Sequence, residues 1–321
     1  MKTWAYILKR ILGSIPMLFI VSLMSFFLIR LSPIDPLAQM KLNPAISKET
    51  IDKETRRLGL DKPIIIQYAL WLKNFLKGDM GYCIDNTKVS AKIKPRVLNT
   101  LALSLTVIFF SWLIALPLGV LAALYYNSLF DKLLTLFSSI GMAIPSFFFA
   151  ILMLLFAQKT GWFPLGGLTS VNFNEMNLFS KTLDILWHLF LPSFVLVTIS
   201  LSSLARQMRA NLLDVLNSEY VKFAYAKGLS KFKVVFKHAL RNAINPIITL
   251  LGFEFAGLLS GAALTEYVFQ YPGLGKLILE AVMQSDINLV MASLMIGSLM
   301  LILGNLIADI LLKFTDPRVG V

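Results

Sequence analysis

The sequence is poor in charged residues, cysteine and histidine, and each shortage excludes a class of protein. Charged residues occupy only 15% of the 321 positions, whereas soluble domains carry roughly 25%. The single cysteine, Cys83, excludes an internal disulfide framework and a cysteine-rich metal site. These shortages disfavour a soluble domain and a secreted disulfide scaffold, and they favour a chain that lies in lipid.

Long apolar runs take the place of the missing charge. Hydrophobic residues make up 57% of the chain, and the mean hydropathy is +0.72. A bilayer core about 30 Å thick needs roughly 20 apolar residues of helix. Six runs qualify, namely 11–31, 98–125, 133–157, 187–204, 244–264 and 289–312. The fourth has Pro192 near its start, where a helix tolerates proline. We therefore expect an all-α polytopic membrane protein with six spans.

Basic residues predict the orientation of these spans. With the N-terminus inside, the cytosolic segments hold fourteen Lys and Arg, eight of them in 205–243. The short external loops 158–186 and 266–288 hold three, so both termini are predicted to be cytosolic. The external segment 32–97 holds twelve more, but loops longer than about 60 residues cross largely regardless of charge. Because the net charge of +12 is spread over both faces, it does not indicate nucleic-acid binding.

The chain is expected to divide into three parts. Residues 1–31 form the cytosolic N-terminus and the first span, which lacks a cleavage site of small residues and is expected to be retained. Residues 32–97 form an external subdomain, in which the segment from Ser47 onward and the segment 64–76 predict two short amphipathic helices. Residues 98–321 form the core, with spans two to six and the cytosolic loop 205–243.

The segment 219–249 has the pattern of a helix–turn–helix. Gly228 supplies a positive-φ helix stop, and Ser230 can cap the helix that follows. The topology rule and attraction to anionic headgroups suffice to explain why 205–243 has eight basic and two acidic residues. They do not explain the ordered pattern of helix, glycine, serine and helix, which favours a handle for a soluble motor.

Two carboxylates, Glu254 and Asp309, lie inside apolar runs, where a charge is expensive. Asp309 is close to the cytosolic end of span six, which favours capping or an interfacial ion pair. Glu254 lies midway along span five, and the sequence leaves open whether it lines a pathway or stays protonated among its neighbours. One isolated carboxylate is too little to indicate proton-coupled transport.

Small residues and a proline predict special packing in spans three and five. In span five, Gly257 and Gly261 permit close approach of helices, within this chain or against a partner. In span three, Gly141 and Pro145 predict a kink in mid-membrane, where the freed carbonyl needs protein or a water-filled path. Such a kink is consistent with a translocation route.

No motif indicates catalysis, so we expect no catalytic residue, metal or cofactor in this chain. His188 and His238 are predicted on opposite sides of the membrane and cannot share a metal. Residues 272–276, Pro-Gly-Leu-Gly-Lys, lack the spacing of a phosphate-binding loop and are predicted to lie outside. ATP and Mg²⁺ are therefore not expected to bind this chain.

The segment 219–249 resembles the cytoplasmic loop of bacterial ABC-importer permeases of the peptide/nickel group. Those subunits have an acidic-Tyr-Val opening, then Ala-x-Ala-Lys-Gly-Leu-Ser, then a basic helix that ends in His-Ala-Leu-Arg-Asn-Ala and a proline. The broader Glu-Ala-Ala signature is only partly kept, since Lys222 and Phe223 replace Glu and Ala. The matching residues are Glu219, Tyr220, Val221, Ala224, Ala226, Lys227, Gly228, Leu229, Ser230, His238, Ala239, Leu240, Arg241, Asn242, Ala243 and Pro246.

The resemblance extends over most of the chain and is strongest to the first (B-type) permease of such systems. It implies a type I ABC-importer permease fold in the bacterial inner membrane, with a helical external subdomain. It also implies a second homologous permease, two cytosolic ATPases that bind ATP and Mg²⁺, and an external substrate-binding protein. Residues 219–227 are then the coupling helix, and Gly228 permits the reversal after it. Further matches lie at Arg10 and at 30–36, 58–63, 67–68, 78–81, 99–100, 265–269, 271–275 and 316–318.

The resemblance leaves the substrate open between dipeptides or oligopeptides and nickel or a metal chelate. The spans have no cluster of His or Cys that would coordinate bare Ni²⁺, which favours peptides. An alternative of a different class is a secondary transporter driven by an ion gradient, with Glu254 as its coupling site. The lack of inverted repeats argues against it.

Overall fold

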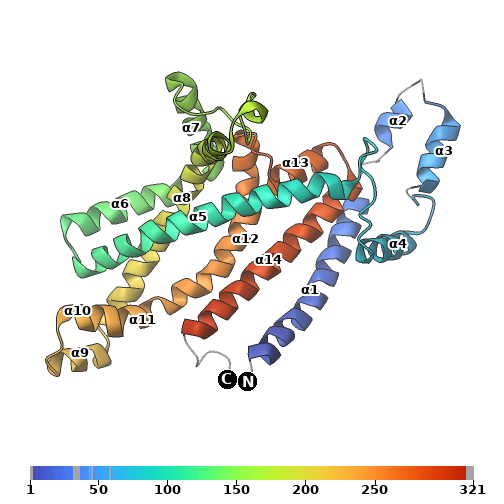
Figure 1. The fold of residues 1–321 in the computed structure, drawn as a ribbon. Coiled ribbons are helices and arrows are strands. Elements are labelled where there is room, and N and C mark those ends of the chain that lie inside the picture. Colours follow the sequence, from blue (N-terminus) through green and yellow to red (C-terminus); the bar gives the residue numbers. More distant parts are fainter. Residues whose placement is uncertain (1–2, 32–36, 43, 45, 58, 316–321) are drawn as a thin grey trace.

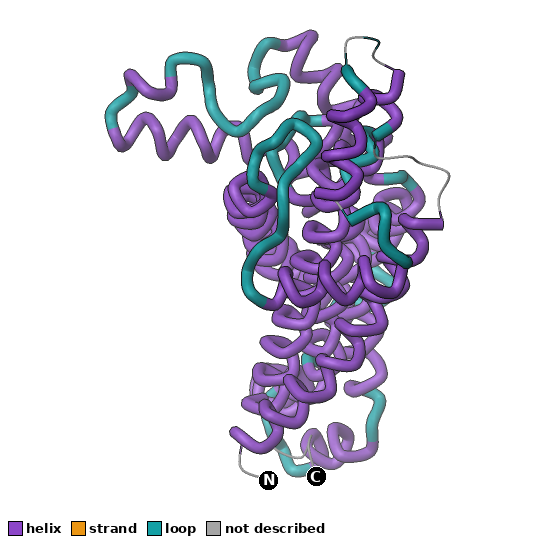
Figure 2. Tube along the Cα trace, turned by 90° about the vertical axis from the view of Figure 1, so that its right-hand side faces the viewer, coloured by secondary structure: helices purple, strands orange, loops and turns teal. Residues whose placement is uncertain are grey.

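The computed structural model describes residues 3–31, 37–42, 44, 46–57 and 59–315, and this part of the chain is helical without a β-strand (Figures 1 and 2). The predicted all-α class is confirmed. The matches at 32–36, Leu58 and 316–318 lie outside the described residues. The helices are α1 (Thr3–Leu31), α2 (Ala38–Leu42), α3 (Lys48–Arg57), α4 (Ile64–Leu76), α5 (Val89–Leu124), α6 (Leu129–Ala143), α7 (Ser146–Thr160), η1 (Phe173–Glu175), α8 (Leu178–Leu216), α9 (Glu219–Ala226), α10 (Lys231–Lys233), η2 (Val234–Ala239), α11 (Leu240–Ala243), α12 (Asn245–Val268), α13 (Leu274–Met283) and α14 (Ile287–Thr315).

Four helices in the described residues are long and apolar enough to cross a membrane, or five if α6 and α7 together count as one span. The four lie in α1, α5, α8 and α14, where spans one, two, four and six are predicted. The 24-residue α12, Asn245–Val268, covers the predicted span 244–264 except for its first residue. Some of its side chains lie outside the described part, so the count of six stays a prediction.

Span three is not the single kinked helix that the sequence predicts. The 15-residue α6 ends at Ala143, the 15-residue α7 begins at Ser146, and the two helices are bent by 98° at the break. Pro145 lies directly before α7. At this position a residue donates no hydrogen bond within the helix, so the missing N–H of proline costs nothing. The proline marks the break as predicted. The bend is much larger than the predicted kink, and it places α7 in contact with α8 and α12.

The 39-residue α8 is longer than the predicted span 187–204 at both ends. Pro192 therefore lies in the interior of the helix and not near its start, which corrects the prediction. The proline removes one backbone donor from the helix. Extensive packing between α5 and α8 stabilises this region. Because α5 begins at Val89, the expected boundary between 97 and 98 falls inside a helix.

The segment predicted to form an external subdomain contains α2, α3 and α4, followed by a loop that returns to the core. The helices α3 and α4 occupy the two segments predicted to be amphipathic helices. The loop is attached to the start of α14 by Asp286, whose carboxylate accepts hydrogen bonds from the N–H groups of Ile84 at 3.0 Å and Leu289 at 3.1 Å. One side chain thus caps α14 and positions the segment before α5.

The only cysteine lies in this loop and is expected to resist alkylation in the folded protein. Cys83 is buried, and burial, with a smaller effect of nearby Asp286, raises the pKa of its thiol from 9.0 to about 11. The reactive thiolate is then about a hundredfold scarcer at neutral pH than for an ordinary thiol. Maleimide labelling followed by mass spectrometry should give slow modification in mild detergent and fast modification in denaturant. Equal rates would contradict the burial.

The start of α1 and the end of α14 lie at the same end of the bundle as α9 to α11 (Figure 1). There Arg10 of α1 pairs with Asp309 of α14, with both N···O distances at 3.1 Å. The predicted ion pair of Asp309 is confirmed. Its forked geometry joins two membrane helices that are about 300 residues apart in sequence.

Candidate functional site

The segment 219–243 forms a compact helical elbow between two long helices, α8 and α12. After α8 ends at Leu216, α9 runs from Glu219 to Ala226, and Gly228 turns the chain with φ of +77°. A Cβ at Gly228 would meet nothing within 4 Å, so the backbone angle and not crowding requires glycine. The Ser230 hydroxyl accepts from the Lys233 N–H at 3.5 Å. The predicted helix, turn and cap are confirmed.

One face of α9 is fixed to the core. Val221 is fully buried and Ala224 nearly so, and their spacing of three residues places them on one side of the helix. They belong to the apolar cluster that contains Met208 and Leu212 of α8. Burial on this side prevents α9 from moving independently of α8.

The other face of α9 is open and aromatic. Phe223 has 61% of its surface exposed, and Tyr220 and Tyr225 are also exposed. The ammonium of Lys227 lies 4.6 Å from the centre of the Phe223 ring. Phe232, just beyond the turn, is 73% exposed. Exposed aromatic and cationic groups gathered in one segment are typical of protein-binding surfaces.

The return from the elbow contains a π-helix, η2, which the sequence does not reveal. It runs from Val234 to Ala239 and is followed by the single turn α11, which leads into α12. Asn242 donates to the Tyr220 hydroxyl at 2.7 Å, and Asn211 of α8 donates to the Ala243 carbonyl at 3.4 Å. These bonds attach α9 and α8 to α11, directly before α12.

A buried ion pair, which the sequence did not predict, joins α6 to α8. The guanidinium of Arg209 makes a forked pair with the carboxylate of Asp131, with Nη2 at 2.8 Å from Oδ2. The same carboxylate accepts from the Asn127 N–H at 2.9 Å, and it is almost completely buried. Only the sequence Ser128-x-x-Asp131, an N-cap and a first-turn acid, marks this site along the chain.

Glu254 joins three helices in the interior of the bundle. Its carboxylate accepts from Trp112 Nε1 of α5 at 2.7 Å and from the Ser200 hydroxyl of α8 at 3.1 Å. Both donors are neutral, and no ion pair to Glu254 is found in the described part of the chain. The contacts give Glu254 a packing role. That it lines a pathway stays a prediction.

The glycines of span five differ in what they permit. A Cβ at Gly257 would meet nothing within 4 Å of the described residues, so crowding there does not require glycine. A Cβ at Gly252 would lie 2.4 Å from Asn305 Oδ1, so Gly252 permits the close approach of α14. Gly261 lies outside the residues whose surroundings the structure describes.

A buried carboxylate clamp at the opposite end of the bundle was also missed by sequence reasoning. Glu266 is fully buried near the end of α12 and accepts from Thr100 Oγ1 at 2.8 Å and from the Lys276 N–H at 2.9 Å. Thr100 Oγ1 in turn accepts from the Leu274 N–H at 2.7 Å. Glu266 thus caps α13. A Cβ at Gly273 would lie 2.1 Å from its carboxylate, which explains the glycine.

The described residues contain no group of three or more His, Cys, Asp or Glu side chains that could hold a metal ion. His188 is buried in α8, and its Nδ1 lies 2.9 Å from the carbonyl oxygen of Asp184. Nδ1 of His188 therefore has a hydrogen-bond partner within α8.

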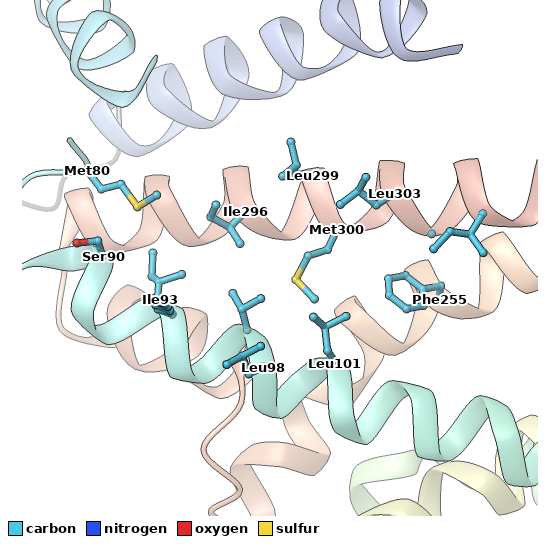
Figure 3. Close-up of a pocket in the computed structure, with 14 residues that line it drawn as sticks. Met80, Ser90, Ile93, Leu98, Leu101, Phe255, Ile296, Leu299, Met300 and Leu303 are labelled. Carbon is cyan, nitrogen blue, oxygen red and sulfur yellow. The ribbon is translucent and has the colours of Figure 1, made fainter. Parts of the chain in front are cut away.

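An apolar groove of about 570 Å³ lies between α5, α12 and α14. Figure 3 shows Met80 and Ser90 at one end and Phe255 at the other. Between them, Leu98 and Leu101 of α5 face Met300 of α14 (Figure 3). The other lining residues are apolar or glycine, except for Lys94, which lies on α5 like Ser90.

Comparison with known proteins gives matches over almost the whole chain. Residues 115–321 match the family "Binding-protein-dependent transport system inner membrane component", and residues 3–114 match its N-terminal companion, "Binding-prot-dependent transport system membrane comp, N-term". The oligopeptide transport system permease protein AppB of Bacillus subtilis is 41% identical over 98% of this chain and 99% of its own length.

Two further relatives carry related names. The di/tripeptide transport system permease protein DppB of Pseudomonas aeruginosa is 36% identical, and the glutathione transport system permease protein GsiC of Escherichia coli is 33% identical. Each covers 98% of this chain and 98% of its own length. Permeases of this family are not themselves enzymes. The chain therefore belongs to the inner membrane components of binding-protein-dependent transport systems, the multi-pass permeases of type I ABC importers.

Proposed function

We propose that this chain forms one half of the pore of an ATP-driven importer that moves dipeptides or oligopeptides into the cell. The relatives are named for oligopeptide, di/tripeptide and glutathione transport, and all of these substrates are peptides. A second homologous permease completes the pore, and an external binding protein delivers the peptide. No observation favours nickel, a metal chelate or an ion-gradient-driven carrier.

The division of α9 into a buried and an exposed face carries the proposal. A helix that receives force must be fixed to the pore on one side and open to its partner on the other. Val221 and Ala224 meet the first requirement, and Phe223 meets the second. Two cytosolic ATPases, which bind ATP and Mg²⁺, dock on this helix in the two permeases. The charge asymmetry of the loops supports a cytosolic place for α9 and for both termini.

Movement of α9 reaches two pore helices directly. The short link of Asn217 and Ser218 connects it to α8, and the hydrogen bond between Tyr220 and Asn242 connects it to α11 and then α12. Closure of the ATPases displaces α8 and α12 together. Such a rigid-body movement switches the pore between outward and inward access.

Replacing Phe223 with alanine tests this docking. The ring is mostly exposed and lies against the ammonium of Lys227, so its loss should leave the fold intact. Truncation of an aromatic hot spot weakens an interface by about 2 kcal/mol or more, which is a loss of roughly thirtyfold in affinity. Copurification of the ATPases and peptide uptake should both fall accordingly.

Phe179→Ala is the matched control, because Phe179 is 72% exposed but lies at the far end of α8. It should leave copurification of the ATPases unchanged. Normal ATPase binding and uptake by the Phe223→Ala protein would refute the docking role. Full ATPase binding without peptide uptake in the unmodified complex would instead refute the peptide substrate.

A further inference from the structure

A polar cavity of about 390 Å³ lies between the external subdomain and the membrane helices, away from the elbow at α9. The end of α1, the helices α3 and α4, the loop after α4 and the start of α14 all contribute to its wall. Figure 1 shows α4 beside the end of α1, at the end of the bundle opposite to α9. The proposed pore function does not use this cavity.

Positive charge predominates in the wall of the cavity. Three basic side chains line it, Arg30 from α1, Arg56 from α3 and Lys62 from the turn before α4. Among the described residues of the lining, Asp79 is the one carboxylate. Its Oδ1 already accepts from the Gly81 N–H at 3.0 Å. The wall therefore has an excess of cations that suits an anion.

Three buried polar atoms of the lining have no hydrogen-bond partner within the part of the chain that the structure describes. They are Nε of Arg30, Nε1 of Trp71 and Oε1 of Gln67. Buried polar atoms without partners are rare and call for a ligand or another explanation. Two of the three are donors that an anion can satisfy, and the third is an acceptor that a hydroxyl can satisfy.

The unpartnered donors are held in position by aromatic packing. The Trp71 ring stacks on Phe75 at a centroid distance of 5.2 Å and on Tyr68 at 6.2 Å. The guanidinium of Arg30 lies 5.6 Å from the centre of the Phe26 ring. A donor that is already oriented loses little conformational entropy when a ligand binds.

The surroundings place the cavity at the level of lipid headgroups. Arg30 lies in the last turn of α1, where its apolar span ends. The 13-residue α4 exposes apolar side chains, with Ile65 at 74% and Leu76 at 77%. Exposed residues of this kind on a short helix, together with tryptophan and basic residues, are typical of the membrane interface.

We propose that this cavity binds the phosphate of an anionic phospholipid headgroup, with phosphatidylglycerol preferred. Arg30, Arg56 and the Trp71 N–H face the phosphate oxygens, for which the planar guanidinium is well suited. A glycerol hydroxyl donates to Gln67 Oε1. A choline headgroup would place its own cation among three basic side chains, so phosphatidylcholine is disfavoured.

Native mass spectrometry of the full-length chain in detergent tests the proposal. With equal amounts of the two lipids, retained phosphatidylglycerol should exceed retained phosphatidylcholine by about tenfold, since charge-assisted hydrogen bonds are the strong ones. The double variant Arg30→Gln, Arg56→Gln should lose this preference. Trp71→Phe keeps the ring and removes only the N–H, and it should weaken retention without disturbing the fold.

Lys73→Gln is the matched control, because Lys73 lies on α4 but does not line the cavity. It should retain phosphatidylglycerol as the unmodified chain does. Equal retention by all variants would overturn the proposal. Displacement of the lipid by inorganic phosphate or by a dipeptide at the same concentration would overturn it too, and would assign the cavity to a soluble anion or to substrate. None of these outcomes bears on docking at α9.

Discussion

Replacing Glu266 with alanine is expected to cause the largest loss of stability of any single substitution considered for this chain. The fully buried carboxylate accepts from Thr100 Oγ1 and the Lys276 N–H. Its removal leaves both donors buried without a partner and opens a cavity beneath Gly273. Each unsatisfied buried group costs about 1–3 kcal/mol, and an uncapped α13 costs about 1 kcal/mol more. A total of several kcal/mol is comparable to the stability of a whole domain.

Thermal unfolding of the purified protein, followed by size-exclusion fluorescence, measures this effect. Glu280→Ala is the matched control, because Glu280 also lies on α13 and pairs with Lys276 at 3.5 Å, but its side chain is 30% exposed. Partly exposed pairs contribute about 1 kcal/mol or less. If the two variants unfold at the same temperature, Glu266 does not act as a buried cap.

The Arg209→Met protein should be destabilised by about 3–5 kcal/mol, because the substitution leaves the buried carboxylate of Asp131 without its cation. Removing the unpaired charge of Asp131 as well should recover part of the lost stability. The double variant Asp131→Asn, Arg209→Met should therefore unfold at a higher temperature than Arg209→Met alone. Uptake should fall in parallel with stability, since the pair joins α6 to α8 and α8 carries the elbow.

The double variant distinguishes two causes of the stability loss, the unpaired carboxylate of Asp131 and the loss of the Arg209 side chain itself. If it is as unstable as the Arg209→Met single variant, then Asp131 is not the reason for the loss. Arg206→Met is the matched control, since Arg206 lies on the same helix and is exposed. Its substitution should change the unfolding temperature little.

The local structure of the elbow followed from the residues themselves. Glycine tolerates a positive φ at little cost, and a serine before a helix accepts a hydrogen bond from its first turn. Gly228 and Ser230 have these roles in the structure. Their pattern along the chain was therefore sufficient to predict the helix, the turn and the cap. The π-helix η2 leaves no such mark in the sequence.

The carboxylates show where local reasoning ends. The depth of Asp309 in span six predicted either capping or an interfacial ion pair, and the structure shows an ion pair with Arg10. The partner itself could not be named, because it lies at the other end of the chain. Glu266 was noted only as part of a matching motif. Its burial depends on Thr100 and on the return of α13, which are contacts between distant segments.

By itself, the sequence determined the class, the positions of the long apolar helices and the local form of the elbow, because these depend on hydropathy and on near neighbours. It also determined the family through matches along the whole chain. The tertiary structure decided the 98° bend between α6 and α7 and the interior position of Pro192 in α8. It also decided which carboxylates accept hydrogen bonds from distant segments and which buried donors line the cavity beside α4. Those features depend on how distant helices pack, and no local pattern records that packing.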